Sequence, residues 1–385
     1  MTGYGGISIL VAKRLPYKGF VGSALSRARA RASGAAIARM ASTGTGGYDF
    51  ELKIAMEAVT LACGLTKSVQ RKLLENETQS KTDNSPVTIA DYGSQAVVSW
   101  ALERQLPAGT FSMIAEEDSE DLRKEDGKAM LQRITELVNS IPSKDALLSS
   151  EDVLCAIDRG KAEGGAQGRH WVLDPIDGTK GFLRGEQYAI ALALLDQGSV
   201  VLGVLGCPNL PLSGLSDDGS SPVGCLFTAV RGAGTTLHPI DGSLQPRKVR
   251  VSDLSDPALA AFCESYESAH SKHDLTSGIA KMLGVTASPI RMDSQAKYGA
   301  MARGDAAIYL RFPHKGYREK IWDHAAGSIV VEEAGGVVVD AAGRALDFSK
   351  GRYLDLDTGI IATNPSLLTA VLTAVETCVG SKSFL

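Results

Sequence analysis

Long apolar segments are missing from the 385-residue sequence. The longest uninterrupted apolar run, residues 188–195, has the length of a β-strand, whereas a membrane-spanning helix needs roughly 18 to 20 apolar residues. Cys-x-x-Cys pairs are also missing, and the six cysteines are scattered, which argues against a zinc site or a disulfide framework. With 44% hydrophobic and 22% charged residues, the composition is that of an ordinary soluble globular protein. We therefore expect no membrane association.

Acidic residues are missing from residues 1–48, which carry seven Lys and Arg among many Ser, Ala and Gly. This composition is typical of an organellar transit peptide, so we expect the segment to direct the protein to the chloroplast or the mitochondrion. The sequence does not choose between these organelles. The alternative is a disordered basic tail without a targeting function, in which case the protein is cytoplasmic.

The remainder of the chain is acidic. Of the 40 Lys and Arg, 33 lie beyond residue 48 together with all 44 Asp and Glu, so this part carries a net charge of about −11. Nucleic-acid binding relies on neutralisation of phosphates by Lys and Arg, so we expect no nucleic-acid partner. A small anionic ligand is compatible with this charge if its site supplies its own cations.

Apolar periodicity predicts both helices and strands along the chain. Spacings of three or four predict helices at residues 49–74, 90–105, 272–283, 324–333 and 366–378. Short apolar runs predict strands at residues 169–173, 188–195, 200–207, 226–230, 248–251 and 306–310. After residue 251 helix and strand alternate, as in layered α/β domains. We place a domain boundary near Ser252, between an N-terminal subdomain at 49–251 and a C-terminal subdomain at 252–385.

Residues 174–179 read Asp-Pro-Ile-Asp-Gly-Thr and follow an apolar strand. The carboxylates of Asp174 and Asp177 converge if a proline-bearing turn bends the backbone between them. Mg²⁺ prefers oxygen ligands, typically one or two carboxylates with backbone carbonyls and waters, and the carbonyl of Ile176 is suitably placed. The hydroxyl of Thr179 could orient a metal-bound water. Taken alone, however, Asp-Pro and Asp-Gly are common in turns that have no function.

Three further acids stand at predicted strand or helix ends. Glu116 follows the apolar run 111–115, Asp323 precedes a predicted helix, and Asp91 precedes the tyrosine at which another helix could begin. Aspartate is a preferred N-cap residue, so Asp91 and Asp323 could each simply cap a helix. Five acids at such junctions in one chain are better explained as a site for more than one metal ion.

Several motifs resemble the lithium-sensitive inositol monophosphatase superfamily. Asp-Pro-Ile-Asp-Gly-Thr at 174–179 and Trp-Asp-His-Ala-Ala-Gly at 322–327 carry this resemblance. The 3′(2′),5′-bisphosphate nucleotidase branch is indicated by four segments, at 84–92, 181–187, 293–298 and 319–324, and the segment 314–318 is similar to plant and algal members. The resemblance covers residues 49–377. It implies a layered α/β/α/β/α sandwich of the inositol monophosphatase and fructose-1,6-bisphosphatase type, with metals where two subdomains meet.

The resemblance also implies a role for each matching residue. Glu116, Asp174 and the carbonyl of Ile176 would hold one Mg²⁺. Asp174, Asp177 and Asp323 would hold a second, and a third ion would lie beside Glu116. Asp91 and Thr179 would activate or orient the attacking water. Substrate contacts are implied for six residues: Thr179, His270, Ser294, Lys297, Arg311 and Asp323.

The implied activity is hydrolysis of 3′-phosphoadenosine 5′-phosphate to AMP and phosphate, with the 5′-phosphosulfate analogue as a second substrate. The nearest alternative is an inositol polyphosphate 1-phosphatase or inositol monophosphatase with the same metal centre, against which the motifs at 181–187 and 293–298 count. A non-catalytic phosphonucleotide sensor would be favoured by the loss of a metal carboxylate or of Thr179, but all of these are present. The sequence leaves a monomer and a homodimer open.

Overall fold

The computed structural model describes residues 47–75, 85–141, 147–216, 221–266, 273–313, 316–356 and 358–380. The expected transit peptide, apart from its last two residues, lies outside these ranges, and so does the expected substrate contact His270. All described residues belong to one compact unit. Among the described helices, none combines the length and the apolar character needed to cross a membrane.

The larger sheet has seven strands in sequence order. They are β1 (Met113–Ala115), β2 (Arg169–Asp177), β3 (Ala189–Asp196), β4 (Ser199–Pro211), β5 (Val223–Val230), β6 (Gly234–Pro239) and β7 (Arg247–Lys248). β1 runs parallel to β2, and each later pair is antiparallel. β3 is buried along all but its last residue. Burial on both faces explains why this strand is continuously apolar rather than alternating.

The smaller sheet has five strands in the order β12-β14-β10-β8-β9. Its strands are β8 (Phe262–Glu264), β9 (Ile290–Arg291), β10 (Ile308–Arg311), β12 (Val337–Asp340) and β14 (Ile360–Thr363). A two-stranded ribbon joins β11 (Glu319–Lys320) and β13 (Tyr353–Leu354). The two main sheets separate in sequence between β7 and β8, and the domain boundary near Ser252 stays a prediction.

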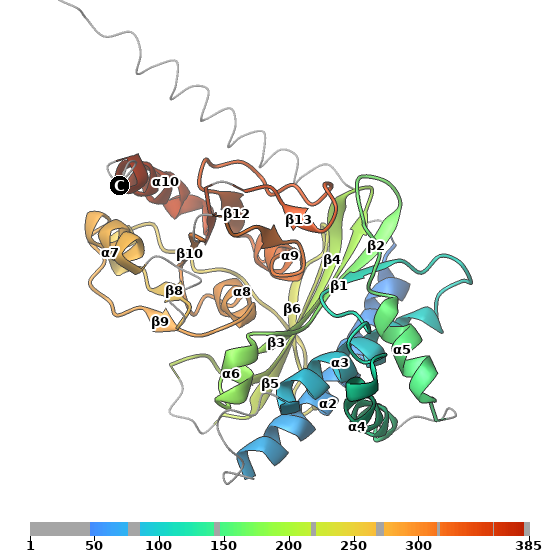
Figure 1. Cartoon of the computed structure of the whole chain (residues 1–385). Coiled ribbons are helices and arrows are strands. Elements are labelled where there is room, and N and C mark those ends of the chain that lie inside the picture. The colour runs from blue at the N-terminus through green and yellow to red at the C-terminus, as the bar shows by residue number, and fades with distance from the viewer. Residues whose placement is uncertain are drawn as a thin grey trace, which may run out of the picture. The chain divides into compact units, whose positions relative to one another are not determined.

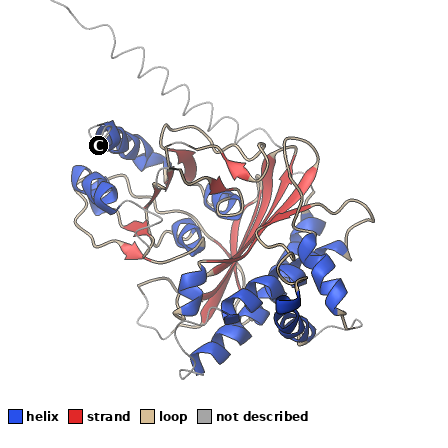
Figure 2. Cartoon of the chain, in the orientation of Figure 1, coloured by secondary structure: helices blue, strands red, loops and turns tan. Residues whose placement is uncertain are grey.

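Helices cover and separate the two sheets (Figure 1). One face of the larger sheet packs against α2 and α3, and its other face packs against α9, which lies with α8 between the sheets. The outer face of the smaller sheet packs against α7 and α10 (Figure 2). This α/β/α/β/α layering confirms the predicted fold class. The helices are α2 (Asp49–Glu75), α3 (Ser85–Glu103), α4 (Lys128–Asn139), α5 (Ser150–Asp158), α6 (Thr179–Leu183), α7 (His273–Met282), α8 (Ala296–Ala302), α9 (Ala325–Glu333) and α10 (Pro365–Gly380).

Close packing of α8 and α9 depends on Gly327. A Cβ atom at this position would lie 2.1 Å from the Cδ2 atom of Tyr298, a distance that real carbon atoms do not adopt. On the sheet side, a Cβ at Gly203 of β4 would lie 2.5 Å from Ile329. These two glycines let α9 lie close to both neighbours. The start of α9, and with it Asp323, is thereby held at a fixed distance from the larger sheet.

Candidate metal centre and active site

Glu116 and Asp174 lie at the same level of two neighbouring parallel strands. The register of β1 and β2 pairs Ala115 with Leu173, so the next residue of each strand is one of these two acids. The carboxyl ends of parallel strands meet at one edge of a sheet, where ligand sites commonly form. The sheet therefore brings together two acids that are far apart in sequence.

Asp174 and Asp177 lie on either side of a β-bulge. Asp174 pairs with Ala191 and Asp177 with Ala189, so β2 advances three residues over a stretch in which β3 advances two. The sequence predicted a turn after a strand end here, but the strand continues through Asp177 and bends at the bulge. The next residue, Gly178, has a φ of 87°, and a Cβ there would lie 2.7 Å from the Cβ of Ser294.

Asp91 does not cap a helix. The helix α3 begins at Ser85, not at Ala90 as predicted, so Asp91 lies within it and its side chain is buried. Ser94, one turn further along, donates a hydrogen bond of 2.8 Å to the carbonyl of Pro175 and thereby ties the bulge to α3. Burial raises the pKa of Asp91 well above its usual value, and the negative charges of Glu117 and Glu116 raise it further.

Asp323 does not act as a cap either. The N-cap position of α9 is His324, whose side chain makes no capping hydrogen bond. The Oδ2 atom of Asp323 lies 3.6 Å from Nη2 of Arg311 and 3.4 Å from the hydroxyl of Tyr317. Burial raises the pKa of Asp323 to about 7, although Arg311 and His324 oppose the shift, and the charge of Asp177 adds to it.

These five acids form one electrostatic cluster, and we call Asp91, Glu116, Asp174, Asp177 and Asp323 the acid cluster. Burial raises the pKa of Asp174 well above its usual value, and the charges of the other four members raise it further. Glu116 lies at the exposed rim, yet desolvation and the charges of Glu117 and Asp177 raise its pKa to about 7. Negative charges within and beside the cluster therefore make the ionised forms of Asp91, Glu116, Asp174 and Asp323 less favourable.

A bound cation would relieve this repulsion. The Oδ1 atom of Asp174 is buried without a hydrogen-bond partner among the described residues, which is costly unless another ligand takes it up. Carboxylate oxygens are the donors that Mg²⁺ prefers, so the acid cluster fits this ion. A second group of potential metal ligands is formed by Glu319, Asp323 and His324, whose ligand atoms lie within 4.8 Å of one another. Both carboxylate oxygens of Glu319 are already hydrogen-bonded, one to Arg311 and one to His324, so they are less suited to bind an ion.

The other predicted site residues lie around this cluster. Asp177 accepts a hydrogen bond of 2.6 Å from the backbone N–H of Gln295, which places the turn of Ser294 beside it. Lys297 is 3% exposed, so it is not a solvated surface charge, and its pKa is lowered by burial although Asp177 opposes the shift. Thr179 is exposed at the first position of α6. The side chain of Ile176 is buried in the core. Their roles as ligands or contacts stay predictions.

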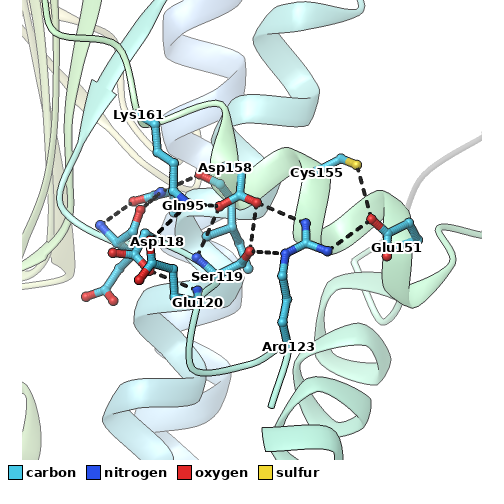
Figure 3. Close-up of polar contacts among 12 residues, drawn as sticks. Gln95, Asp118, Ser119, Glu120, Arg123, Glu151, Cys155, Asp158 and Lys161 are labelled. Carbon is cyan, nitrogen blue, oxygen red and sulfur yellow. Dashed lines mark hydrogen bonds and ion pairs between the residues drawn. The ribbon is translucent and has the colours of Figure 1, made fainter.

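Sequence reasoning missed two residues that hold the strand end at Glu116, namely Gln95 and Arg352. Gln95 of α3 donates to the carbonyls of Glu117 (2.6 Å) and Ile157 (2.8 Å) and accepts from the N–H of Glu117 (3.0 Å). Beside it, Asp158 accepts hydrogen bonds from Ser119 and Arg123, which fixes the loop that follows Glu117 (Figure 3). Most of these hydrogen bonds involve backbone atoms, so no sequence motif predicts them.

The second missed residue is Arg352. Its guanidinium donates to the carbonyls of Ala115 (2.6 Å), Gly160 (3.1 Å) and Ala162 (3.1 Å) and stacks over the ring of Trp322, 4.9 Å from the centroid. Ala115 precedes Glu116, and Trp322 precedes Asp323. Arg352 therefore bridges the two segments that carry Glu116 and Asp323 of the acid cluster.

The acid cluster gathers carboxylates from α3, from β2, from the end of β1 and from the start of α9, and comparison with known proteins identifies the family. The chain belongs to the inositol monophosphatase family, whose model matches residues 48–379. Enzymes of this family depend on metal ions.

Particular relatives carry narrower names. A 3′(2′),5′-bisphosphate nucleotidase 1 from Arabidopsis thaliana is 59% identical over 345 residues, covering 87% of this chain and 98% of the relative. A 3′(2′),5′-bisphosphate nucleotidase from Oryza sativa is also 59% identical, covering 87% and 96%. Among solved structures, CysQ from Bacteroides thetaiotaomicron, a bacterial member of the family, has a TM-score of 0.55 at 19% identity, covering 83% and 98%. This last similarity concerns the fold alone.

Proposed function

We propose that the protein hydrolyses the 3′-phosphate of 3′-phosphoadenosine 5′-phosphate, giving AMP and phosphate, and that it also accepts the 5′-phosphosulfate analogue. The observation that carries the chemistry is the acid cluster, in which five carboxylates act on one another around an unpartnered oxygen of Asp174. The proposed substrate is supported by the names of relatives from Arabidopsis and rice, which are called bisphosphate nucleotidases. Four of them are 48–59% identical to this chain, and their matches cover 86–88% of it.

The cofactor we propose is Mg²⁺, in two or three ions. Glu116, Asp174 and the carbonyl of Ile176 would hold one ion. Asp174, Asp177 and Asp323 would hold another, and a third would lie beside Glu116. Paired divalent cations lower the pKa of a bound water and neutralise charge on the leaving oxygen. Both effects accelerate the hydrolysis of a phosphate monoester, a reaction whose uncatalysed rate enzymes exceed by up to ~10²¹-fold.

The remaining side chains would handle the proton and the substrate. Burial raises the pKa of Asp91, which makes its carboxylate a stronger proton acceptor, and the exposed hydroxyl of Thr179 would orient a water. Lys297 and Arg311 would supply the positive charge for the second phosphate, which the acidic protein otherwise repels. We assign Ser294 and His270 to further nucleotide contacts, and Thr179 and Asp323 would also touch the substrate.

Phosphate release tests this proposal. The purified protein is assayed with 3′-phosphoadenosine 5′-phosphate, inositol 1,4-bisphosphate and AMP, each with Mg²⁺, with Mg²⁺ and Li⁺, and with EDTA. We expect the highest kcat/KM for the bisphosphate nucleotide, no activity in EDTA, and inhibition by Li⁺. A higher kcat/KM for the inositol compound would show that this compound, and not the nucleotide, is the preferred substrate. Binding without turnover of any compound would identify the protein as a sensor.

We further propose that residues 1–48 direct the protein to the chloroplast or the mitochondrion. The support is their composition, which is rich in Arg, Ser and Ala and free of acids. A fluorescent fusion of residues 1–60 would show which organelle receives it. Diffuse cytoplasmic fluorescence would contradict targeting.

A further inference from the structure

A chain of buried polar side chains ends at Arg311, the residue that we assign to the second phosphate. We call its four members the buried tetrad: Tyr298 of α8, His324 before α9, Glu319 of β11 and Arg311 of β10. Their exposed side-chain or residue fractions are low, from 0% for Glu319 to 12% for Arg311. The tetrad crosses the layer between the two sheets and reaches the acid cluster at Asp323.

Each link in the tetrad has hydrogen-bond geometry. The hydroxyl of Tyr298 lies 2.9 Å from Nδ1 of His324, and Nε2 of His324 lies 2.9 Å from Oε2 of Glu319. Nε of Arg311 then donates to Oε1 of Glu319 at 2.7 Å. A carboxylate only accepts, so Nε2 of the histidine is the donor to it, and with a neutral ring the tyrosine hydroxyl donates to Nδ1.

The Glu319 end of the tetrad is ionised. Burial alone would raise the pKa of Glu319, but Arg311 and His324 lower it to about 2. A buried ion pair of this kind is often no more stabilising than apolar residues of the same volume, because desolvation offsets the attraction. Its presence beside the acid cluster is therefore better explained by what it does to Arg311 than by stability.

The tetrad uses only one edge of the guanidinium. Among the described residues, the hydrogen bond of Arg311 runs through Nε to Glu319, and its Nη2 lies 3.6 Å from Asp323, beyond good hydrogen-bond length. The fork of terminal amino groups of Arg311 thus lies beside Asp323 with donors that a ligand can take up. Such a fork matches the oxygens of a phosphate.

A second cation lies near this fork. Lys297 is buried, and the positive charge of Arg311 acts on it, lowering its pKa further. The ammonium of Lys297 bonds to the carbonyl of Met292 at 3.2 Å and lies over the ring of Tyr309. Two buried cations that repel each other are stabilised when an anion binds between them.

We propose that Tyr298, His324 and Glu319 are positioning residues that aim the fork of Arg311 at the second phosphate of the substrate. They thereby set the preference for a bisphosphate over a monophosphate, without touching the phosphate that is hydrolysed. This inference deepens the proposed function and rests on it.

The test compares two substrates that differ only in the second phosphate, 3′-phosphoadenosine 5′-phosphate and adenosine 3′-phosphate, at saturating Mg²⁺. Glu319→Gln removes the charge that fixes Arg311, and we expect it to lower kcat/KM for the bisphosphate about 10- to 100-fold, mainly through KM. The value for the monophosphate should change less than about threefold. Tyr298→Phe, which removes one hydroxyl, should give the same pattern at about 2- to 10-fold.

Asp340→Asn is the matched control. Asp340 is 2% exposed and accepts a 2.7 Å bond from Arg344, so it is also a buried carboxylate paired with arginine. It lies on β12, and its described side-chain hydrogen bonds run to Ala342 and Arg344, not to the tetrad or the acid cluster. We expect this variant to leave the ratio of the two kcat/KM values unchanged. Equal losses on both substrates in Glu319→Gln and Tyr298→Phe, or no loss on either, would overturn the inference. If Glu319→Gln does not fold, the ratio in Tyr298→Phe decides alone.

Failure of the proposed function would look different. If the wild-type protein prefers inositol 1,4-bisphosphate, the substrate proposal fails. The tetrad is then tested by the ratio of kcat/KM for inositol 1,4-bisphosphate to kcat/KM for inositol 1-phosphate. If no compound turns over, calorimetric affinities for the two adenosine compounds take the place of kcat/KM. In each case a loss confined to the ligand with two phosphates supports the tetrad, and a uniform change contradicts it.

Discussion

Replacing Asp323 with asparagine keeps the shape of the side chain and removes its charge. In the folded protein the pKa of Asp323 is raised from 3.8 to about 7, chiefly by burial. Below pH 3.8 the carboxyl is protonated in both the folded and the unfolded chain, so it costs nothing. The cost grows as the pH rises from about 4 to about 7 and is complete above this range, where about three pKa units correspond to at most about 4 kcal/mol.

Asp323→Asn should therefore stabilise the protein in EDTA, and the gain should depend on pH. At pH 8 we expect a free energy of unfolding higher by up to about 4 kcal/mol, and near pH 4 by less than about 1 kcal/mol. Mg²⁺ should reverse much of this advantage. At 100 times its Kd it stabilises the wild type by about 3 kcal/mol, whereas the variant lacks a ligand and gains less.

Urea unfolding followed by tryptophan fluorescence measures these differences, in EDTA and in Mg²⁺ at each pH. Phosphate release from the same samples should fall at least about 100-fold in Asp323→Asn, because the change removes a carboxylate from the proposed centre. A variant that is less stable than the wild type in EDTA at pH 8 would refute the reasoning. So would a variant that keeps full activity.

Three further changes test other parts of the account. Arg352→Met removes the hydrogen bond that Arg352 donates to the carbonyl of Ala115 and its stacking on Trp322, so calorimetry should show Mg²⁺ binding weaker by about 10-fold or more. Unchanged affinity would contradict the bridge. Gly327→Ala forces a methyl group into the ring packed against it and should lower the free energy of unfolding by about 1–3 kcal/mol in urea. Lys297→Met should raise KM for the bisphosphate about 10- to 100-fold with little change in kcat, and an unchanged KM would exclude it as a phosphate contact.

The long elements could be predicted from sequence because their apolar patterns are strong. Residues 49–74, 324–333 and 366–378 predict α2, α9 and α10 closely, and the apolar runs at 188–195 and 200–207 predict β3 and β4. Most of the smaller sheet could not be found this way. Four of its strands, β8, β9, β12 and β14, have two to four residues, and at that length an apolar run does not distinguish a strand from a buried helix or a loop.

The acids of the site could be proposed from residue type and position, but their arrangement could not. The bulge that turns Asp177 depends on the pairing of β2 with β3, which local sequence does not encode. Gln95 and Arg352 act through backbone carbonyls of distant segments, so their side chains form no motif. Two members of the tetrad, Glu319 and His324, lie in the segment 319–324, which the sequence singles out. Their hydrogen bonds to Arg311 and Tyr298 could not be predicted, because these residues come together only in the folded chain.

The position and the chemistry of bond cleavage test the central claim most directly. 3′-Phosphoadenosine 5′-phosphate is hydrolysed with Mg²⁺ in ¹⁸O-labelled water, and the products are separated and weighed by mass spectrometry. Attack of water on the 3′-phosphorus predicts unlabelled AMP and released phosphate that carries one ¹⁸O atom. Adenosine 3′-phosphate as the product, label on the ribose, or equal release in EDTA would contradict a metal-dependent 3′-phosphatase.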